Sequence, residues 1–253
     1  MTAAPSIENH VFGNPEALAR GAAAWLCERA QASEGTFAVC LSGGSTPRRL
    51  YECLADPALA ARFPWDRTHW FWGDERFVPH DHPDSNYRMA HDALLSHVPA
   101  PANHIHAMPT EGLSPDQAAA AYEATLRRFY GADSFDPARP LFDVMLLGIG
   151  DDGHTASLFP GTAALRETRR WAVAVIGAKP EPRLTLTYPA LDSSRDVVFL
   201  AAGAGKRTVV ERAQTGDQAS DQNGNDAIPA ARVRPVGRLH WFTDRAAAPG
   251  DAH

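Results

Sequence analysis

Short runs of consecutive apolar residues alternate along the chain with segments whose apolar residues recur every three or four positions. Uninterrupted apolar runs are typical of strands buried on both faces of a parallel sheet. The strands predicted from such runs, with their glycine and polar ends included, cover residues 36–44, 68–77, 142–150, 171–177, 196–203 and 239–244. Helical spacing covers residues 15–32, 46–56, 85–98, 114–130 and 206–213. This alternation predicts an α/β fold, a Rossmann-like open, mostly parallel sheet with helices on both faces.

Three of the predicted helices start with a capping signal. Asn14 and Ser114 each precede a proline, and a cap residue followed by proline is typical of the first helical turn. Thr46 stands before a proline in the same way. We therefore expect these three polar side chains to cap their helices.

No internal repeat and no clear linker divides the 253 residues, and one large α/β domain accommodates that length. We expect a single domain over residues 1–253, with a frayed tail from 246 onwards. Residues 213–235 are polar and contain glycine, so we expect their first half, 213–227, to be a surface loop, either a lid or an insertion.

The composition is that of an ordinary globular protein, with 44% hydrophobic and 21% charged residues. The formal net charge is −6, whereas a general nucleic-acid binder usually has a basic excess. No apolar run has the length of a membrane span, and no signal peptide follows Met1. Cys27, Cys40 and Cys53 have no framework spacing, so we expect buried, reduced thiols. These features predict a cytoplasmic protein that binds neither nucleic acid nor membrane, either a monomer or a small homo-oligomer.

Glycines and polar side chains gather where four of the predicted strands end. In an open parallel sheet, ligands bind beyond the carboxyl ends of the strands. The four segments are SGGST at 42–46, GDER at 73–76, GIGDDGH at 148–154 and AGAGK at 202–206. We expect them to surround one ligand site.

The segment SGGST at 42–46 suits a phosphate group. In the loop formed by Ser42, Gly43, Gly44, Ser45 and Thr46, bare backbone N–H groups and hydroxyls stand at a helix N-terminus. A tight turn with an N-cap explains the loop equally well. The spacings GxxxxGK[ST] and GxGxxG are absent, so a nucleotide is not indicated.

Basic side chains follow other predicted strands. Lys206 stands at a helix start, where a cation opposes the helix dipole by about 0.3–1 kcal/mol. This cost indicates an anionic ligand nearby, and a solvated surface lysine explains the segment about equally well. Arg76, beside Asp74, suits a bidentate grip on phosphate or carboxylate, and a structural ion pair is the alternative. Arg183 is either a ligand contact or a surface charge.

The turn after residues 142–150 combines His154 with two aspartates. Histidine is the natural general base near neutral pH, and a carboxylate such as Asp152 could fix its tautomer. A lone histidine is more often structural, but the strand-end position favours catalysis. Asp151 is given no role. The HxH pairs at 80–82 and 104–106 lack companion ligands, and no HExxH motif is present, so we expect no metal site.

Taken together, these segments resemble the 6-phosphogluconolactonase family. The resemblance covers nearly the whole chain, and DGHTASLFP is its most specific part. Glucosamine-6-phosphate deaminases of the same superfamily share a GDGH-like turn but continue with Ile-Ala-Phe-Asn-Glu-Pro, where this chain has Thr-Ala-Ser-Leu-Phe-Pro. The blocks that carry the resemblance are LSGGSTP, FWGDERFVP with DSNYRMA, LLGIGDDGHTASLFPGT, PRLTLTYPAL and AGAGK.

The resemblance implies hydrolysis of 6-phospho-D-glucono-1,5-lactone to 6-phospho-D-gluconate in the oxidative pentose phosphate pathway, without metal or organic cofactor. It implies that His154 is the general base and that Asp152 orients it. The substrate phosphate or the developing oxyanion would be held by loop 42–46, Arg76, Arg183 and Lys206, with Asp74 a further substrate contact.

Two other functions stay open. One is an amino-sugar-phosphate isomerase or deaminase with Asp74 as the base, which the absence of a glutamate after His154 disfavours. The other is a non-catalytic sugar-phosphate sensor, which would be expected to carry a helix-turn-helix and could lose the Asp152 and His154 pair.

Overall fold

Six strands form one parallel sheet in the computed structural model, which describes residues 6–215 and 228–250. Every pairing between neighbours in this sheet is parallel. The predicted α/β class and mostly parallel sheet are therefore confirmed. The strands lie in the order β1 (Ser6–Phe12), β9 (Arg238–Asp244), β8 (Ser194–Ala201), β5 (Phe142–Leu147), β2 (Phe37–Leu41) and β3 (Thr68–Trp72).

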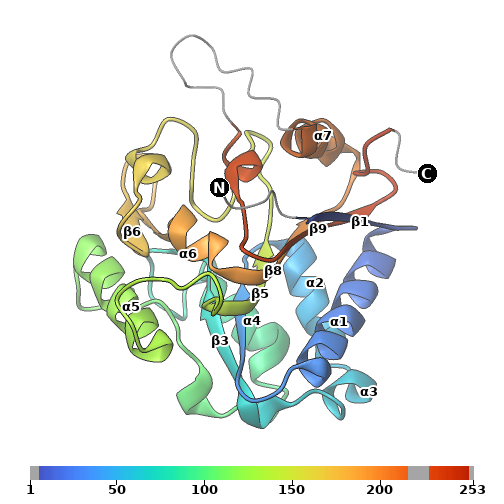
Figure 1. Ribbon diagram of the computed structural model, residues 1–253, viewed down its shortest axis with the longest axis horizontal. Helices are drawn as coiled ribbons and strands as arrows, with labels where there is room; N and C mark the ends of the chain where they lie inside the picture. The colour runs from blue at the N-terminus through green and yellow to red at the C-terminus, as the bar shows by residue number, and fades with distance from the viewer. Residues whose placement is uncertain (1–5, 216–227, 251–253) are drawn as a thin grey trace.

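Helices cover both faces of this sheet, as predicted. The ring of Trp25 on α1 lies edge-on to His240 of β9, with ring centroids 5.1 Å apart. From the other face, Gln214 of α7 donates a hydrogen bond to Asn9 of β1. Figure 1 shows α7 above β1 and β9, and α1 below them. The helices are α1 (Pro15–Ala32), α2 (Ser45–Leu54), α3 (Pro57–Ala60), α4 (Asn86–Ala90), α5 (Pro115–Tyr130), α6 (Tyr188–Asp192) and α7 (Arg207–Thr215).

A second, antiparallel sheet is the main departure from the prediction. It consists of β4 (Asp74–Arg76), β7 (Arg183–Leu186) and β6 (Ala172–Val175). The single strand expected at 68–77 breaks at Gly73, whose N–H donates to Leu41 of the large sheet while its carbonyl accepts from Leu186 of the small one. The strand expected at 171–177 is present as β6, but it belongs to the antiparallel sheet and not, as expected, to the parallel sheet.

The helix termini follow the sequence signals in two of three cases. The Asn14 side chain accepts a hydrogen bond from the backbone of α1, and Ser114 forms a full capping box with Gln117 of α5. The expected cap at Thr46 is wrong, because α2 begins at Ser45 and Gly44 occupies the cap position without a side-chain bond. The helix expected over 85–98 is α4 followed by a π-helical turn at His91–Leu95.

The buried apolar residues form one continuous cluster that spans both sheets, which supports the proposal of a single domain. The three cysteines are buried and free, as expected. The expected fraying from 246 is wrong for the described part of the tail, because Ala247 and Ala248 are buried in a turn that Asp244 closes. Residues 216–227, most of the expected loop 213–227, lie outside the described residues. Within residues 6–215 and 228–250, no helix is both long and apolar enough to span a bilayer.

Candidate active site

A cleft of about 350 Å³ opens at the carboxyl ends of β2 and β5. These adjacent strands form the topological switch point, since the chain continues from β2 to β3 on one side and from β5 to β8 on the other. All four polar strand ends contribute to the cleft, as the sequence predicts. The predicted site residues that line it are Ser42, Gly43, Gly44, Ser45, Thr46, Asp74, Arg76, His154 and Lys206.

A larger hollow of about 600 Å³ lies at the opposite, amino-terminal ends of the strands. Asp143 and Asp196 face arginines there, and Asp196 is held by Arg238 at 2.9 Å. None of the predicted site residues lines this hollow.

The Asp152 carboxylate contacts the imidazole ring of His154. The distance from His154 Nδ1 to Asp152 Oδ1 is 2.5 Å, and the same oxygen accepts the backbone N–H of His154 at 3.1 Å. Burial opposes ionisation of Asp152, but these two bonds outweigh it and lower the pKa of its carboxyl. Because the pair uses Nδ1, Nε2 is the ring nitrogen available for proton transfer. Asp152 thus contacts His154 and does not line the cleft itself.

The turn around His154 depends on two glycines. A Cβ atom on Gly150 would lie 2.0 Å from His154 Nδ1, so the imidazole occupies the space that a side chain would need. Gly153 has a φ of 80°, a left-handed conformation that favours glycine, and its N–H donates to the Gly150 carbonyl. Glycines at these positions let the imidazole lie against the backbone of its own turn.

Asp151, which has no role in the sequence prediction, pairs with Lys206. The Lys206 Nζ lies 2.6 Å from Asp151 Oδ1. This bond lowers the pKa of the Asp151 carboxyl. The Asp151 side chain is 87% exposed and that of Lys206 is 30% exposed, so solvent screens much of the attraction. The pair fixes Lys206 at the rim of the cleft without neutralising it strongly.

Tyr51 and Asn86 fix loop 42–46, and the backbone of the loop faces the cleft. The buried Tyr51 hydroxyl donates to the Ser42 carbonyl and accepts from the Ser42 N–H. Asn86, which sequence reasoning missed, packs so close that a Cβ on Gly43 would lie 2.1 Å from its Oδ1. The DSNYRMA block contains Asn86, but no spacing in it indicates contact with residue 43. Since no side chain caps α2 and its first turn holds no acid, its N–H groups remain available to an anion.

The acidic residues of β4 have different roles. Asp74 lines the cleft, and its Oδ2 accepts a hydrogen bond from Ser157 Oγ at 2.7 Å. Glu75 is buried and accepts from the backbone N–H groups of Asn86 and Tyr87. Glu75 therefore anchors the start of α4, whereas Asp74 keeps one oxygen for a ligand.

Arg183 lies beside Arg76 and not on the cleft surface. The two residues are opposite each other in the antiparallel pairing of β4 with β7. The Arg183 side chain is 12% exposed, and its buried Nη1 has no hydrogen-bond partner among the described residues. Burial and the neighbouring Arg76 charge lower the pKa of Arg183. Two adjacent guanidinium groups give this side of the cleft a positive potential that suits an anion.

Within the described part of the chain, one group of three side chains could hold a metal ion: Glu8, His10 and His240. It belongs to β1 and β9 and does not line the cleft. The residues around His154 form no such group among those described.

The sequence of this chain matches a known protein family. The family described as glucosamine-6-phosphate isomerases/6-phosphogluconolactonase matches residues 13–241. The chain belongs to this family. A 6-phosphogluconolactonase of Nostoc sp. is 45% identical over 214 residues, which cover 85% of this chain and 84% of the relative. A 6-phosphogluconolactonase of Synechocystis sp. is 44% identical over 220 residues, covering 87% and 86%.

Solved structures of the 6-phosphogluconolactonase/isomerase family have the same fold. The 6-phosphogluconolactonase of Trypanosoma brucei superimposes with a TM-score of 0.80 at 31% identity and covers 96% of this chain and 97% of its own. A monomeric glucosamine-6-phosphate deaminase superimposes with a TM-score of 0.75 at 19% identity, covering 96% and 98%. The deaminase likeness extends to the fold alone. The relatives from Nostoc sp. and Synechocystis sp., which are 44–45% identical to this chain, are both named 6-phosphogluconolactonase.

Proposed function

We propose that this protein hydrolyses 6-phospho-D-glucono-1,5-lactone to 6-phospho-D-gluconate, a reaction of the oxidative pentose phosphate pathway, with His154 as the general base. The observation that carries the proposal is the Asp152–His154 pair at a cleft whose other walls suit an anion. The lactonases at 44–45% identity support the same substrate.

His154 performs the proton transfer in this proposal. Its Nε2 takes a proton from a water molecule while the water oxygen attacks the lactone carbonyl carbon. Asp152 stabilises the imidazolium that forms, through the bond to Nδ1. The tetrahedral intermediate then expels the ring oxygen, and the imidazolium returns the proton to it, which leaves a carboxylic acid and a free hydroxyl. A positioned base of this kind contributes about 10²–10⁴-fold.

The cationic side of the cleft binds the phosphate and the developing oxyanion. The open N-terminus of α2 offers backbone N–H groups, and Lys206 and Arg76 offer charged donors. Arg183 adds positive charge beside Arg76. Phosphate binding far from the reacting carbon positions the lactone ring, and removal of one oxyanion donor costs about 10²–10³-fold in comparable sites. Asp74 accepts from a sugar hydroxyl through its free oxygen.

The surroundings of Asp74 argue against a deaminase. Its carboxylate already accepts from Ser157, which belongs to the Ser-Leu-Phe-Pro segment that replaces the deaminase glutamate. The sensor alternative gains no support, because both members of the catalytic pair are present and in contact.

The test is an assay with freshly generated 6-phosphogluconolactone, in which acid release is followed above the spontaneous rate. We expect enzymatic acid release with the phosphorylated lactone, a much lower kcat/KM with unphosphorylated glucono-1,5-lactone, and no ammonia from glucosamine 6-phosphate. Acid release at only the spontaneous rate, or ammonia release, contradicts the proposal.

A further inference from the structure

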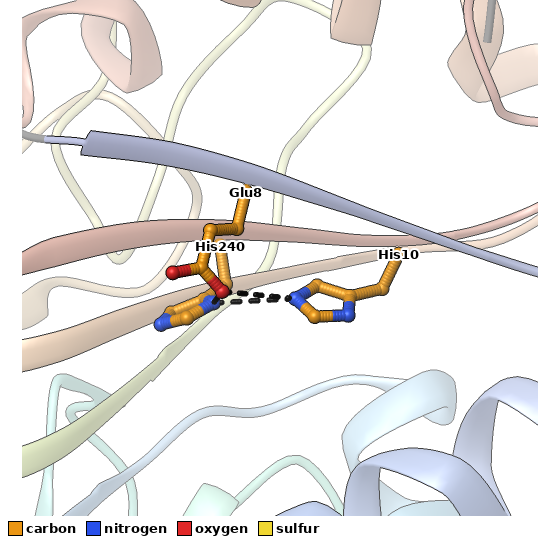
Figure 2. Close-up of side chains that lie close together, drawn as sticks. All are labelled: Glu8, His10 and His240. Carbon is orange, nitrogen blue, oxygen red and sulfur yellow. Dashed lines mark hydrogen bonds and ion pairs between the residues drawn. The ribbon is translucent and has the colours of Figure 1, made fainter.

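Three side chains of types that can bind a metal ion meet at the edge of the large sheet, away from the cleft. Glu8 and His10 project from the edge strand β1 and His240 projects from the adjacent β9 (Figure 2). They point toward the face that α1 covers, where Trp25 packs against His240. His240 is fully buried, whereas the side chains of Glu8 and His10 are 41% and 31% exposed. The cluster is therefore closed on one side and open to solvent on the other.

The distances among the ligand atoms match those around a tetrahedral metal ion. His240 Nδ1 lies 3.3 Å from His10 Nε2 and 3.3 Å from Glu8 Oε2. His10 Nε2 lies 3.7 Å from Glu8 Oε2. Ligands about 2.0–2.2 Å from a zinc ion in tetrahedral geometry are about 3.3–3.6 Å apart. One ion can thus bind all three atoms with little movement of the exposed side chains.

A buried carboxylate fixes the orientation of the central histidine. His240 Nε2 lies 3.0 Å from Asp196 Oδ1, and Arg238 holds the same oxygen at 2.9 Å. Since Nε2 donates its proton to Asp196, Nδ1 presents a lone pair to Glu8 and His10. A lone pair and a carboxylate 3.3 Å apart repel each other unless a cation or an additional proton lies between them. A histidine that donates to a carboxylate and binds metal through its other nitrogen is a common arrangement.

We propose that Glu8, His10 and His240 bind one zinc ion, with a water molecule as the fourth ligand. Two imidazoles and one carboxylate are a ligand set typical of zinc. The ion would join the edge strand β1 to β9 and stabilise the fold, independently of the lactonase reaction. Motif spacing along the chain does not predict this site, because His10 and His240 are 230 residues apart.

The proposal is tested by titrating zinc into the chelator-treated full-length protein against a competing chromogenic chelator. We expect one tight site per chain, a higher Tm in the presence of zinc, and the visible absorption of four-coordinate cobalt when Co²⁺ replaces zinc. E8Q and H10A change only partly exposed side chains and should each weaken zinc binding at least about tenfold. H91A removes an exposed histidine beside Asp92 and is the matched control, with unchanged affinity expected. Absence of a stoichiometric site in the unaltered protein, or equal zinc affinity in E8Q, H10A and H91A, overturns the proposal.

Discussion

The bond between Asp152 and His154 makes a sharp prediction about the variant Asp152→Asn. The substitution keeps the size of the side chain but removes its charge. The new amide group can also donate a hydrogen bond to Nδ1 of His154. In that case the imidazole carries its proton on Nε2, and Nε2 can no longer accept a proton from water. Both effects act on the transition state, so kcat should fall while KM changes little.

The size of the effect follows from the geometry of the pair. A hydrogen bond to a charged group contributes about 1.5–3 kcal/mol. The Asp152 side chain is 46% exposed, so solvent screening favours the lower half of that range. A loss of about 1.5–2.3 kcal/mol corresponds to a kcat about 10- to 50-fold lower, because 1.36 kcal/mol is a factor of ten.

The assay is the initial rate of acid release over a range of lactone concentrations, corrected for spontaneous hydrolysis. The matched control is Asp151→Asn, which removes the adjacent carboxylate but no bond to His154. Through Lys206 it should change KM and leave kcat within about twofold. If kcat of Asp152→Asn also stays within about twofold of the unaltered protein, Asp152 does not support the base and the reasoning is refuted.

Three further predictions concern a glycine of the His154 turn, two basic side chains of the cleft and a buried carboxyl group. Gly150→Ala places a methyl group 2.0 Å from His154 Nδ1 and should lower kcat by about 10²-fold by displacing the imidazole, whereas unchanged kinetics would contradict the packing. Arg76→Ala and Lys206→Ala should each weaken binding of 6-phosphogluconate by about 10- to 150-fold in calorimetric titrations, with little effect on the binding of unphosphorylated gluconate. If the affinity for each ligand is the same in both variants as in the unaltered protein, the phosphate site is ruled out. Burial raises the pKa of Asp192 to about 6, so the folded protein holds this proton more tightly than the unfolded chain and loses stability as pH rises from about 4 through 6. The unfolding free energy of Asp192→Asn minus that of the unaltered protein should therefore rise by up to about 3 kcal/mol from pH 4 to pH 7. A difference between the two proteins that is the same at both pH values would contradict this.

The strands that the sequence predicts are those buried on both faces. β2 is a continuous apolar run, and β5 is apolar except for Asp143. Both strands are buried over nearly their whole length, and their glycine-rich ends locate the cleft. β1 escapes prediction because it is an edge strand with mixed polar and apolar residues, several of them exposed. β7 is short, and its pairing with β4 is a tertiary contact that no local pattern encodes.

The sequence predicts the contacts of the site whose two residues are close together along the chain. Asp152 and His154 are two residues apart, so their contact follows from the turn itself. The sequence does not indicate a role for Asp151, because its partner Lys206 is 55 residues away. Asn86 reaches the cleft only because Glu75 anchors the start of α4 against β4. Arg183 lies opposite Arg76 in the antiparallel pairing of β4 with β7, a contact between distant segments that no local pattern encodes, and its place at the ligand stays a prediction.

The measurement that tests the central claim most directly is the turnover of His154→Ala on fresh 6-phosphogluconolactone, together with its affinity for 6-phosphogluconate. If His154 is the general base, kcat should fall by about 10²-fold or more, while the affinity for the phosphorylated product stays close to that of the unaltered protein. Turnover at the unaltered rate in this variant would contradict the account.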